Sequence, residues 1–353
     1  MLYVISMPKI PLTLLDNNRV SKLQNRKSLF LDTCVWIDLI EGIKPYSAEA
    51  RALLQKLVSQ KILFCPLSLT LMMELFSQEY DSALRQAELM EELSLNVSFR
   101  IKEEIGGEEV QALIAALLTT NVDISPVSLD YSNIYVPVSG YMGAHMFLEY
   151  PEGVETHDLA KVVEGLQEKI MKQSVIEIVH SMKDELPSRS LSDNFDAEVF
   201  SEILKERRIA SNGSRKKARE IEKHSLFEQT LVPLVFKITR HMPPTQRLQA
   251  LKVVHDYAES LGGNANEVIM AKLPLLRQSV EVLTATGLDH RRSHSPNYTV
   301  DTENMIIPAI YADALVAPDK WVRAMMSDKA VRETTHAIFL SSFPELIAYC
   351  KSL

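Results

Sequence analysis

Four acidic residues of this 353-residue chain could do chemistry together: Asp32, Glu74, Asp301 and Asp319. Each is expected just after a strand, in the helix that follows one, or at the head of a helix, and a parallel sheet gathers such positions at one edge. Carboxylates packed together repel one another and raise each other's pKa, so the group makes physical sense around a cation. Their hard oxygen atoms select Mg²⁺ or Mn²⁺ over zinc. Such a cation would polarise a phosphodiester and activate a water, without a side-chain nucleophile.

The elements that must position these acids alternate between short apolar strands and helices at both ends of the chain. Asp32 and Thr33 form the junction between an apolar strand and a helix that stops at Gly42. Ser68 opens an apolar helix in which Glu74 is the only charged residue. Strands that alternate with such helices predict a parallel sheet. The expected strands cover 28–31, 61–65, 314–316 and 335–340, and the expected helices include 47–59, 302–311, 319–326 and 343–350.

The middle of the chain differs, because its apolar residues recur at helical spacing. The predicted fold class is therefore α/β, a parallel sheet flanked by helices and interrupted by a large all-helical insertion. The predicted organisation is an N-terminal extension over 1–27, a discontinuous α/β domain over 28–80 plus 291–353, and the insertion over 81–290. Helices are expected in the insertion over 81–94, 107–119, 157–184, 195–208, 214–238, 243–261 and 265–286.

Three segments resemble the signatures of the PIN domain family, the fold of many metal-dependent ribonucleases and bacterial toxin nucleases. They are LDTCVWIDL at 31–39, CPLSLTLMMEL at 65–75 and DTENMIIPAIYADALVAPDKW at 301–321, in the family's order and strand context. The resemblance implies a PIN-like sheet and an endonuclease, most naturally an endoribonuclease, with one or two Mg²⁺ or Mn²⁺ ions. Family members often form homodimers. The catalytic and metal-binding residues that it implies are Asp32, Glu74, Asp301 and Asp319.

Two features favour a protein of another class. Family members usually carry a hydroxyl residue two positions before the fourth acid, where this chain has Ala317. The chain also has 46 Asp and Glu against 38 Lys and Arg, a net charge of −8 that repels polyanions as a whole. The alternative is a catalytically inactive PIN-like binding or scaffold protein whose insertion binds a protein partner. A third and more distant option is a helical phosphohydrolase that uses His255 and Asp256.

Each acid of the group also has an ordinary structural role open to it. The three aspartates could cap the helices that follow them, a role that Asp often fills. Glu74 could be a solvated surface charge, although its sequence neighbours are apolar. Two further acids, Asp38 and Asp313, are interpreted as structural.

Basic residues gather in one run, KERRIASNGSRKKAREIEKH at 205–224. Cations gain affinity for nucleic acid by releasing condensed counterions, so the run predicts contacts with RNA, and DNA is a second candidate. The other interpretation is a solvated loop and helix start, since Asn212 and Gly213 mark a turn. Lys320, next to the fourth acid, is expected to stabilise leaving-group charge. The expected nucleic-acid-binding residues are Arg207, Arg208, Arg215, Lys216, Lys217, Arg291, Arg292 and Lys320.

Cysteine content and hydropathy indicate the compartment. Cys34, Cys65 and Cys350 are few, odd in number and widely spaced, which fits a reducing compartment. No segment reaches the roughly 18 apolar residues of a membrane-spanning helix, so no membrane partner is expected. The first residues also lack the basic start and the cleavage site of a secretion signal. The predicted location is the cytoplasm.

Overall fold

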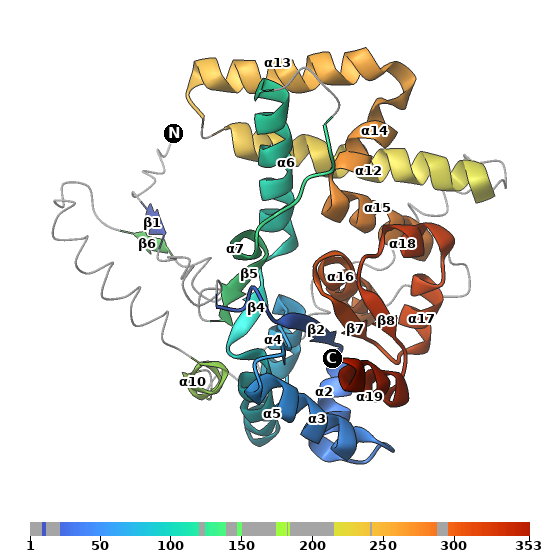
Figure 1. Ribbon diagram of the computed structural model, residues 1–353. Coiled ribbons are helices and arrows are strands. Elements are labelled where there is room, and N and C mark those ends of the chain that lie inside the picture. Colours follow the sequence, from blue (N-terminus) through green and yellow to red (C-terminus); the bar gives the residue numbers. More distant parts are fainter. Residues whose placement is uncertain are drawn as a thin grey trace.

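The computed structural model describes residues 9–11, 22–119, 124–138, 147–149, 174–181, 183, 215–240, 242–287 and 296–353 (Figure 1). Most of these residues are helical, and the strands between the helices are short. None of the described helices is both long enough and apolar enough to cross a bilayer.

A four-stranded parallel sheet in the order β3-β2-β7-β8 organises the two ends of the chain. Its strands are β2 (Lys27–Leu31), β3 (Leu63–Phe64), β7 (Ala314–Val316) and β8 (Ile338–Leu340). In the register, Leu31 lies opposite Val316, and Val316 lies opposite Leu340. All of β7 is buried, and β2 is buried after its first residue, as in parallel sheets that are covered on both faces. The predicted parallel sheet is present, and this mostly helical fold is compatible with the predicted α/β class.

The strand order reverses between β2 and β7. The chain leaves β2 for β3 on one side and returns much later to β7 on the other side. In open α/β sheets, ligands bind beyond the carboxyl ends of the strands at such a reversal. Here these two ends are directly joined, because the N–H of Asp32 donates to the carbonyl of Val316 at 3.0 Å.

Local sequence signals explain where the helices beside the sheet begin and end. α2 (Thr33–Glu41) starts at Asp32 and stops at Gly42, whose φ of 68° is a left-handed conformation that glycine adopts without strain. α4 (Leu69–Phe76) begins at Ser68, whose hydroxyl accepts from the N–H of Leu71 at 3.2 Å. The other helices beside the sheet are α3 (Ser47–Ser59), α5 (Tyr80–Ser94), α16 (Pro296–Tyr311), α17 (Lys320–Met326), α18 (Lys329–Thr334) and α19 (Phe343–Ser352).

The buried apolar side chains form two cores. The sheet core surrounds the four strands, and the helical core lies among the helices of the middle of the chain. Figure 1 shows α6 extending from the region of the sheet towards α13. The helices around the second core are α6 (Lys102–Thr119), α12 (Arg215–Thr239), α13 (Pro244–Leu261), the 3₁₀ turn η2 (Gly262–Asn264), α14 (Ala265–Lys272) and α15 (Pro274–Gly287).

Helix α15 belongs to both cores. Its residues Leu275 and Val282 are buried in the sheet core, whereas Leu276 and Val280 are buried in the helical core. Residues seven or four apart lie on one face of a helix, so α15 presents a different apolar face to each core. This helix is therefore a shared wall between the two parts of the molecule.

Three short strands correct the expectation that 81–290 is all helical. β4 (Val97–Phe99) pairs antiparallel with β5 (Tyr135–Pro137), which follows the short helix α7 (Tyr131–Ile134). β6 (Phe147–Glu149) pairs antiparallel with β1 (Lys9–Pro11). The rings of Phe99 and Tyr135 lie 5.0 Å apart inside the sheet core, and α5 packs there too. The sheet core therefore continues past residue 81, where the insertion was expected to begin. Strands of three residues are too short to show a sequence periodicity.

Other helix boundaries differ from the prediction mainly at prolines. The helix expected over 265–286 is divided into α14 and α15, since Pro274 has no N–H for a continuous helix. The helix expected after Asp301 begins at Pro296, because proline suits a first helical turn. The strand expected over 335–340 is shorter in the structure, where β8 begins only at Ile338. Of the helix expected over 157–184, only α10 (Val175–Ser181) is described, and 195–208 lies outside the described residues.

Candidate functional site

Asp32 occupies the carboxyl end of β2 at the point where the strand order reverses. It caps α2, and its Oδ1 accepts from the N–H of Thr33 at 2.9 Å. The thiol of Cys34 donates to its Oδ2 at 3.2 Å. The residue is buried, with 7% of its surface exposed. The strand–acid–helix junction predicted from the sequence is thus present, and the capping role weighed for Asp32 is real as well.

Glu74 reaches the same edge from α4. Its Oε2 accepts a short hydrogen bond from the hydroxyl of Thr33, so the residue that follows Asp32 holds the second acid. Glu74 is half-buried, which excludes the simple surface charge weighed from the sequence. One threonine thus orients both carboxyl groups, through its main chain for Asp32 and through its side chain for Glu74.

The electrostatics of the two acids show that they share one environment. Burial raises the pKa of Asp32, two hydrogen bonds from Cys34 and Thr33 oppose the change, and the charge of Asp319 adds to it. Burial likewise raises the pKa of Glu74, against the hydrogen bond from Thr33 and together with the charge of Asp32. Asp32 is therefore electrostatically coupled to both other acids, which favours the binding of a cation among them.

Asp319 follows β7 and caps α17. Its Oδ1 accepts from the N–H groups of Trp321 at 2.6 Å and Val322 at 3.0 Å. The capping role weighed from the sequence is therefore observed here too. Asp319 lies at the same edge of the sheet as Asp32, and its negative charge raises the pKa of Asp32.

Asp301 lies inside α16, not at its head, and its side chain is outside the described residues. Asn304, one turn later on the same helix, is buried, and its Oδ1 accepts from the hydroxyl of Ser68 at 2.5 Å. This bond ties α16 to the start of the helix that carries Glu74. Sequence reasoning did not single out Asn304, although an amide three residues after an acid on an apolar helix is a readable signal.

A cavity of about 660 Å³ opens beside two of these acids. Its lining includes the buried Asp32, the half-buried Asp319, the exposed loop between α2 and α3, and the start of α19. A volume of this size is typical of small-ligand sites. The lining residues are Asp32, Thr33, Cys34, Ile37, Asp38, Lys44, Pro45, Tyr46, Pro318, Asp319, Ser341, Ser342, Phe343 and Pro344.

The donor chemistry of the site suits a hard divalent cation. In the part of the chain that the structure describes, no three His, Cys, Asp or Glu side chains are grouped as metal ligands. Mg²⁺ needs no such group, because it is commonly held by one or two carboxylates together with waters and substrate phosphates. Asp32 and Glu74 supply carboxylate oxygens, which are the kind of donor that this ion takes. Cys34 points its thiol at Asp32, and burial raises the pKa of this thiol, which disfavours thiolate ligation.

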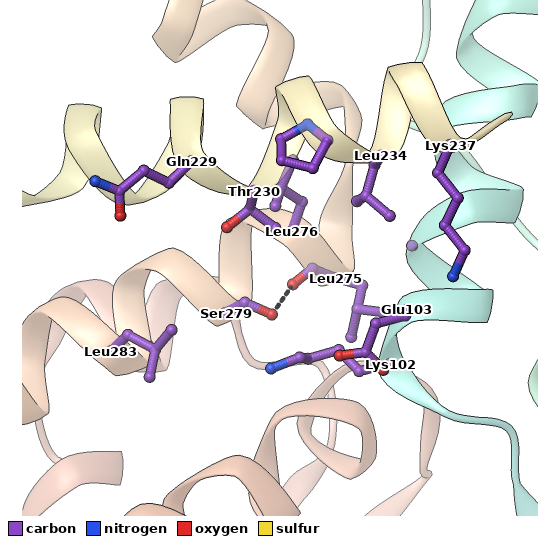
Figure 2. A pocket seen from close by; sticks show the side chains of 12 residues that line it. Lys102, Glu103, Gln229, Thr230, Leu234, Lys237, Leu275, Leu276, Ser279 and Leu283 are labelled. Carbon is purple, nitrogen blue, oxygen red and sulfur yellow. Dashed lines mark hydrogen bonds between the residues drawn. The ribbon is translucent and has the colours of Figure 1, made fainter. Parts of the chain in front are cut away.

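A second cavity, of about 350 Å³, lies far from this chemistry, between α6, α12 and α15 (Figure 2). Figure 2 shows Leu234, Leu275 and Leu276 along it, with Lys102 and Lys237 towards the α6 side. None of the four predicted acids lines it. The cavity beside Asp32 is therefore the better candidate for a catalytic site.

The predicted basic residues are only partly described. Lys217 is exposed on α12, while Arg207, Arg208, Arg291 and Arg292 lie outside the described residues, as do the side chains of Arg215 and Lys216. Lys320 is exposed, and its ammonium group lies 4.8 Å from the ring centre of Trp321.

Two other cations of the basic run have structural partners. Arg219 bonds Asp328 of α18 and the buried Glu281 of α15, and Lys223 bonds Glu281 as well. Part of the run therefore holds α12 against its neighbours.

Three further residues singled out in the sequence lie away from the acids or play other parts. Asp313 accepts from Lys27 and from the N–H of Ser28 at the amino end of the sheet, which confirms its structural role. Asp38 lines the cavity beside Asp32, a position that its structural interpretation did not anticipate. His255 is exposed on α13 and pairs with Glu259, 3.6 Å away, which gives no support to a buried phosphohydrolase pair.

Comparisons with family models, with curated protein sequences and with solved structures return no match to this chain.

Proposed function

We propose that this protein is a PIN-like, metal-dependent endonuclease whose substrate is RNA. The observation that supports it most is the position of Asp32 and Asp319 at the reversal of strand order, with Glu74 held beside Asp32 by Thr33. Two acids that line a cavity, with Glu74 hydrogen-bonded next to one of them, fit a site that collects a cation and a phosphodiester. Asp301, on the helix tied to Ser68 through Asn304, is the fourth proposed member.

In this proposal each residue has a defined task. Asp32 and Glu74 bind one Mg²⁺ or Mn²⁺, and Asp319 and Asp301 complete the acidic group. A bound cation would polarise the phosphodiester and lower the pKa of an attacking water. Thr33 and Cys34 orient the carboxylates through their hydrogen bonds. Lys320, next to Asp319 in the sequence, is the residue proposed to stabilise negative charge that develops on the leaving group.

RNA is the proposed substrate and the cation-bearing helical part of the chain its proposed selector. With a net charge of −8, the molecule must contact a polyanion through local patches. The described end of α12 offers one exposed cation there, Lys217, and the same helix is anchored to the sheet part by Arg219. DNA cleavage and dimer formation stay secondary proposals.

Cleavage of a labelled mixed-sequence single-stranded RNA tests the proposal. Wild-type protein is expected to cut the RNA with Mn²⁺ or Mg²⁺ and to stop in EDTA. Asp32→Asn is expected to lose at least about 100-fold in rate, in the range seen when one electrostatic group of an active site is removed. Asp313→Asn is the matched control, because this aspartate lies at the opposite end of the sheet.

Two results would contradict the proposal. Cleavage that survives in Asp32→Asn would show a different active centre or a contaminating nuclease. Equal inactivity of wild type and variant, with both folded, would favour the scaffold alternative, in which the helical part binds a protein.

A further inference from the structure

The cavity beside Asp32 continues outward to a loop that carries an aromatic ring and a cation. Lys44, Pro45 and Tyr46 lie between α2 and α3, line the cavity and are exposed, so they form its outer end, whereas the buried Asp32 marks its inner end. Phe343 and Pro344 at the start of α19 also line the cavity and contribute apolar surface. The outer end thus carries an aromatic ring and a cation, and the inner end is acidic.

We propose that this outer end binds one unpaired nucleotide of single-stranded RNA, next to the phosphodiester that is cut. The base packs on the ring of Tyr46, and Lys44 contacts a phosphate of the same strand. This inference depends on the proposed nuclease function, and it names the substrate class and the residues that select it.

Tyr46 is suited to stacking because its ring is available and its backbone is held in an unusual conformation. The residue is 58% exposed, although it is a large aromatic residue at a cavity wall. Its φ is 72°, in the left-handed region, which is strained for a residue other than glycine. Bases stack on aromatic side chains without regard to sequence, since every base has a π-face.

Lys44 supplies the positive charge that the other residues lining this cavity lack. It is the lysine among the lining residues, which also include Asp32, Asp38 and Asp319. Burial raises the pKa of Asp38, and the charge of Lys44 opposes that change, so the ammonium group partly offsets the charge of Asp38. A phosphate can enter from this side with less repulsion than from the acidic inner end.

The cavity selects single strands for a geometric reason. A base must leave its stack and its pairing partner before an aromatic ring can pack on its face. Double-stranded RNA presents no free base face, and so it cannot use Tyr46. A duplex of the same sequence is therefore expected to bind more weakly than the single strand.

Fluorescence anisotropy with a labelled single-stranded RNA tests the proposal. The measurements use the full chain with Asp32→Asn, which keeps the RNA intact, in Mg²⁺. Tyr46→Ala is expected to weaken binding roughly tenfold or more, which corresponds to the loss of one base–aromatic stack. Tyr46→Phe keeps the ring and is expected to keep the affinity. Lys44→Ala is expected to weaken binding and to lower its salt dependence, as the loss of one phosphate contact does.

Ile43→Ala is the matched control, because Ile43 is 74% exposed in the same loop and does not line the cavity. Unchanged affinity in Tyr46→Ala, or equal binding of duplex and single strand, would overturn the proposal. A single-stranded DNA of the same sequence that binds as well as RNA, with the same dependence on Tyr46, would also overturn the RNA assignment.

The outcomes keep the two proposals apart. If wild type cuts RNA while Tyr46→Ala binds and cuts normally, the nuclease proposal stands and the stacking site is wrong. If single-stranded RNA binds through Tyr46 but no variant or wild type cuts it, the nuclease proposal is wrong and the cavity is a binding site.

Discussion

Thr33 joins the two inner acids of the candidate site. Its N–H donates to Asp32 and its hydroxyl donates to Glu74, so a hydrogen bond from Thr33 fixes the orientation of each carboxylate. Removal of groups that orient metal ligands in this way typically costs about 10- to 100-fold in metal affinity or activity. The sequence marks Thr33 only as the residue after Asp32. Its contact with Glu74, 41 residues later, depends on how α2 and α4 pack together. A local sequence pattern does not show this packing.

Thr33→Val removes the hydroxyl and keeps the branched shape. We expect the Mn²⁺ concentration for half-maximal cleavage to rise about 10- to 100-fold, or the rate to fall by a similar factor, the usual effect of losing such a supporting group. Thr33→Ser should restore most of the activity, because it brings the hydroxyl back. Titrations of RNA cleavage against Mn²⁺ compare the three proteins. Activity in Thr33→Val equal to wild type would remove Thr33 from the site.

At the scale of elements, helices α6, α15 and α16 meet at one buried carboxyl group. Glu109 of α6 has no exposed surface, and its Oε1 accepts from the hydroxyl of Tyr311 at 2.5 Å and from the N–H of Leu275 at 2.9 Å. Its Oε2 has no hydrogen-bond partner among the described residues. Burial raises the pKa of Glu109 to about 7, while the bonds from Tyr311, Leu275 and Leu276 oppose the change.

Glu109 is therefore expected to make stability depend on pH. Its folded pKa of about 7 lies above the ordinary value of 4.5 for a glutamate, so the folded state holds the proton more tightly. The stabilisation that Glu109 contributes to the folded state is complete below about pH 4.5 and is lost as the pH rises through 7. At 1.36 kcal/mol per pKa unit, the free energy of unfolding falls by at most about 3 kcal/mol. Chemical denaturation at pH 5 and pH 8 should show this decrease for wild type. Glu109→Gln should flatten it, whereas Glu103→Gln, an exposed change on the same helix, should not.

The elements themselves were predictable where a local signal exists. Strands next to Asp32 and Asp319, and helices that open at Ser68 and Asp319, follow from alternation and capping residues. The pairing of β4 with β5 could not be read, because three-residue strands owe their conformation to burial in the sheet core. The left-handed conformation of Tyr46 could not be predicted either, because a tyrosine at this position gives none of the signal that a glycine or asparagine would.

At the scale of the whole molecule, α15 and the cations of α12 bind the two cores together. Arg219 bridges Glu281 and Asp328, and so joins α12, α15 and α18. The apolar faces of α15 are buried on both sides. The region expected from the sequence to be a separate insertion therefore has one helix, α15, that also packs in the sheet core. Sequence periodicity identifies apolar helix positions but does not say which core each face meets.

This shared wall predicts that the two cores unfold together. Both tryptophans, Trp36 and Trp321, belong to the sheet part, so their fluorescence reports that part, while far-UV circular dichroism is dominated by the helices. Val280→Ala removes two methyl groups from the helical core and should destabilise the protein by about 2 kcal/mol. If the cores are coupled, the tryptophan and dichroism transitions shift together in this variant. Leu248→Ala, 69% exposed on α13, should shift neither. A dichroism transition that moves while the fluorescence transition stays in place would show that the helical core unfolds on its own.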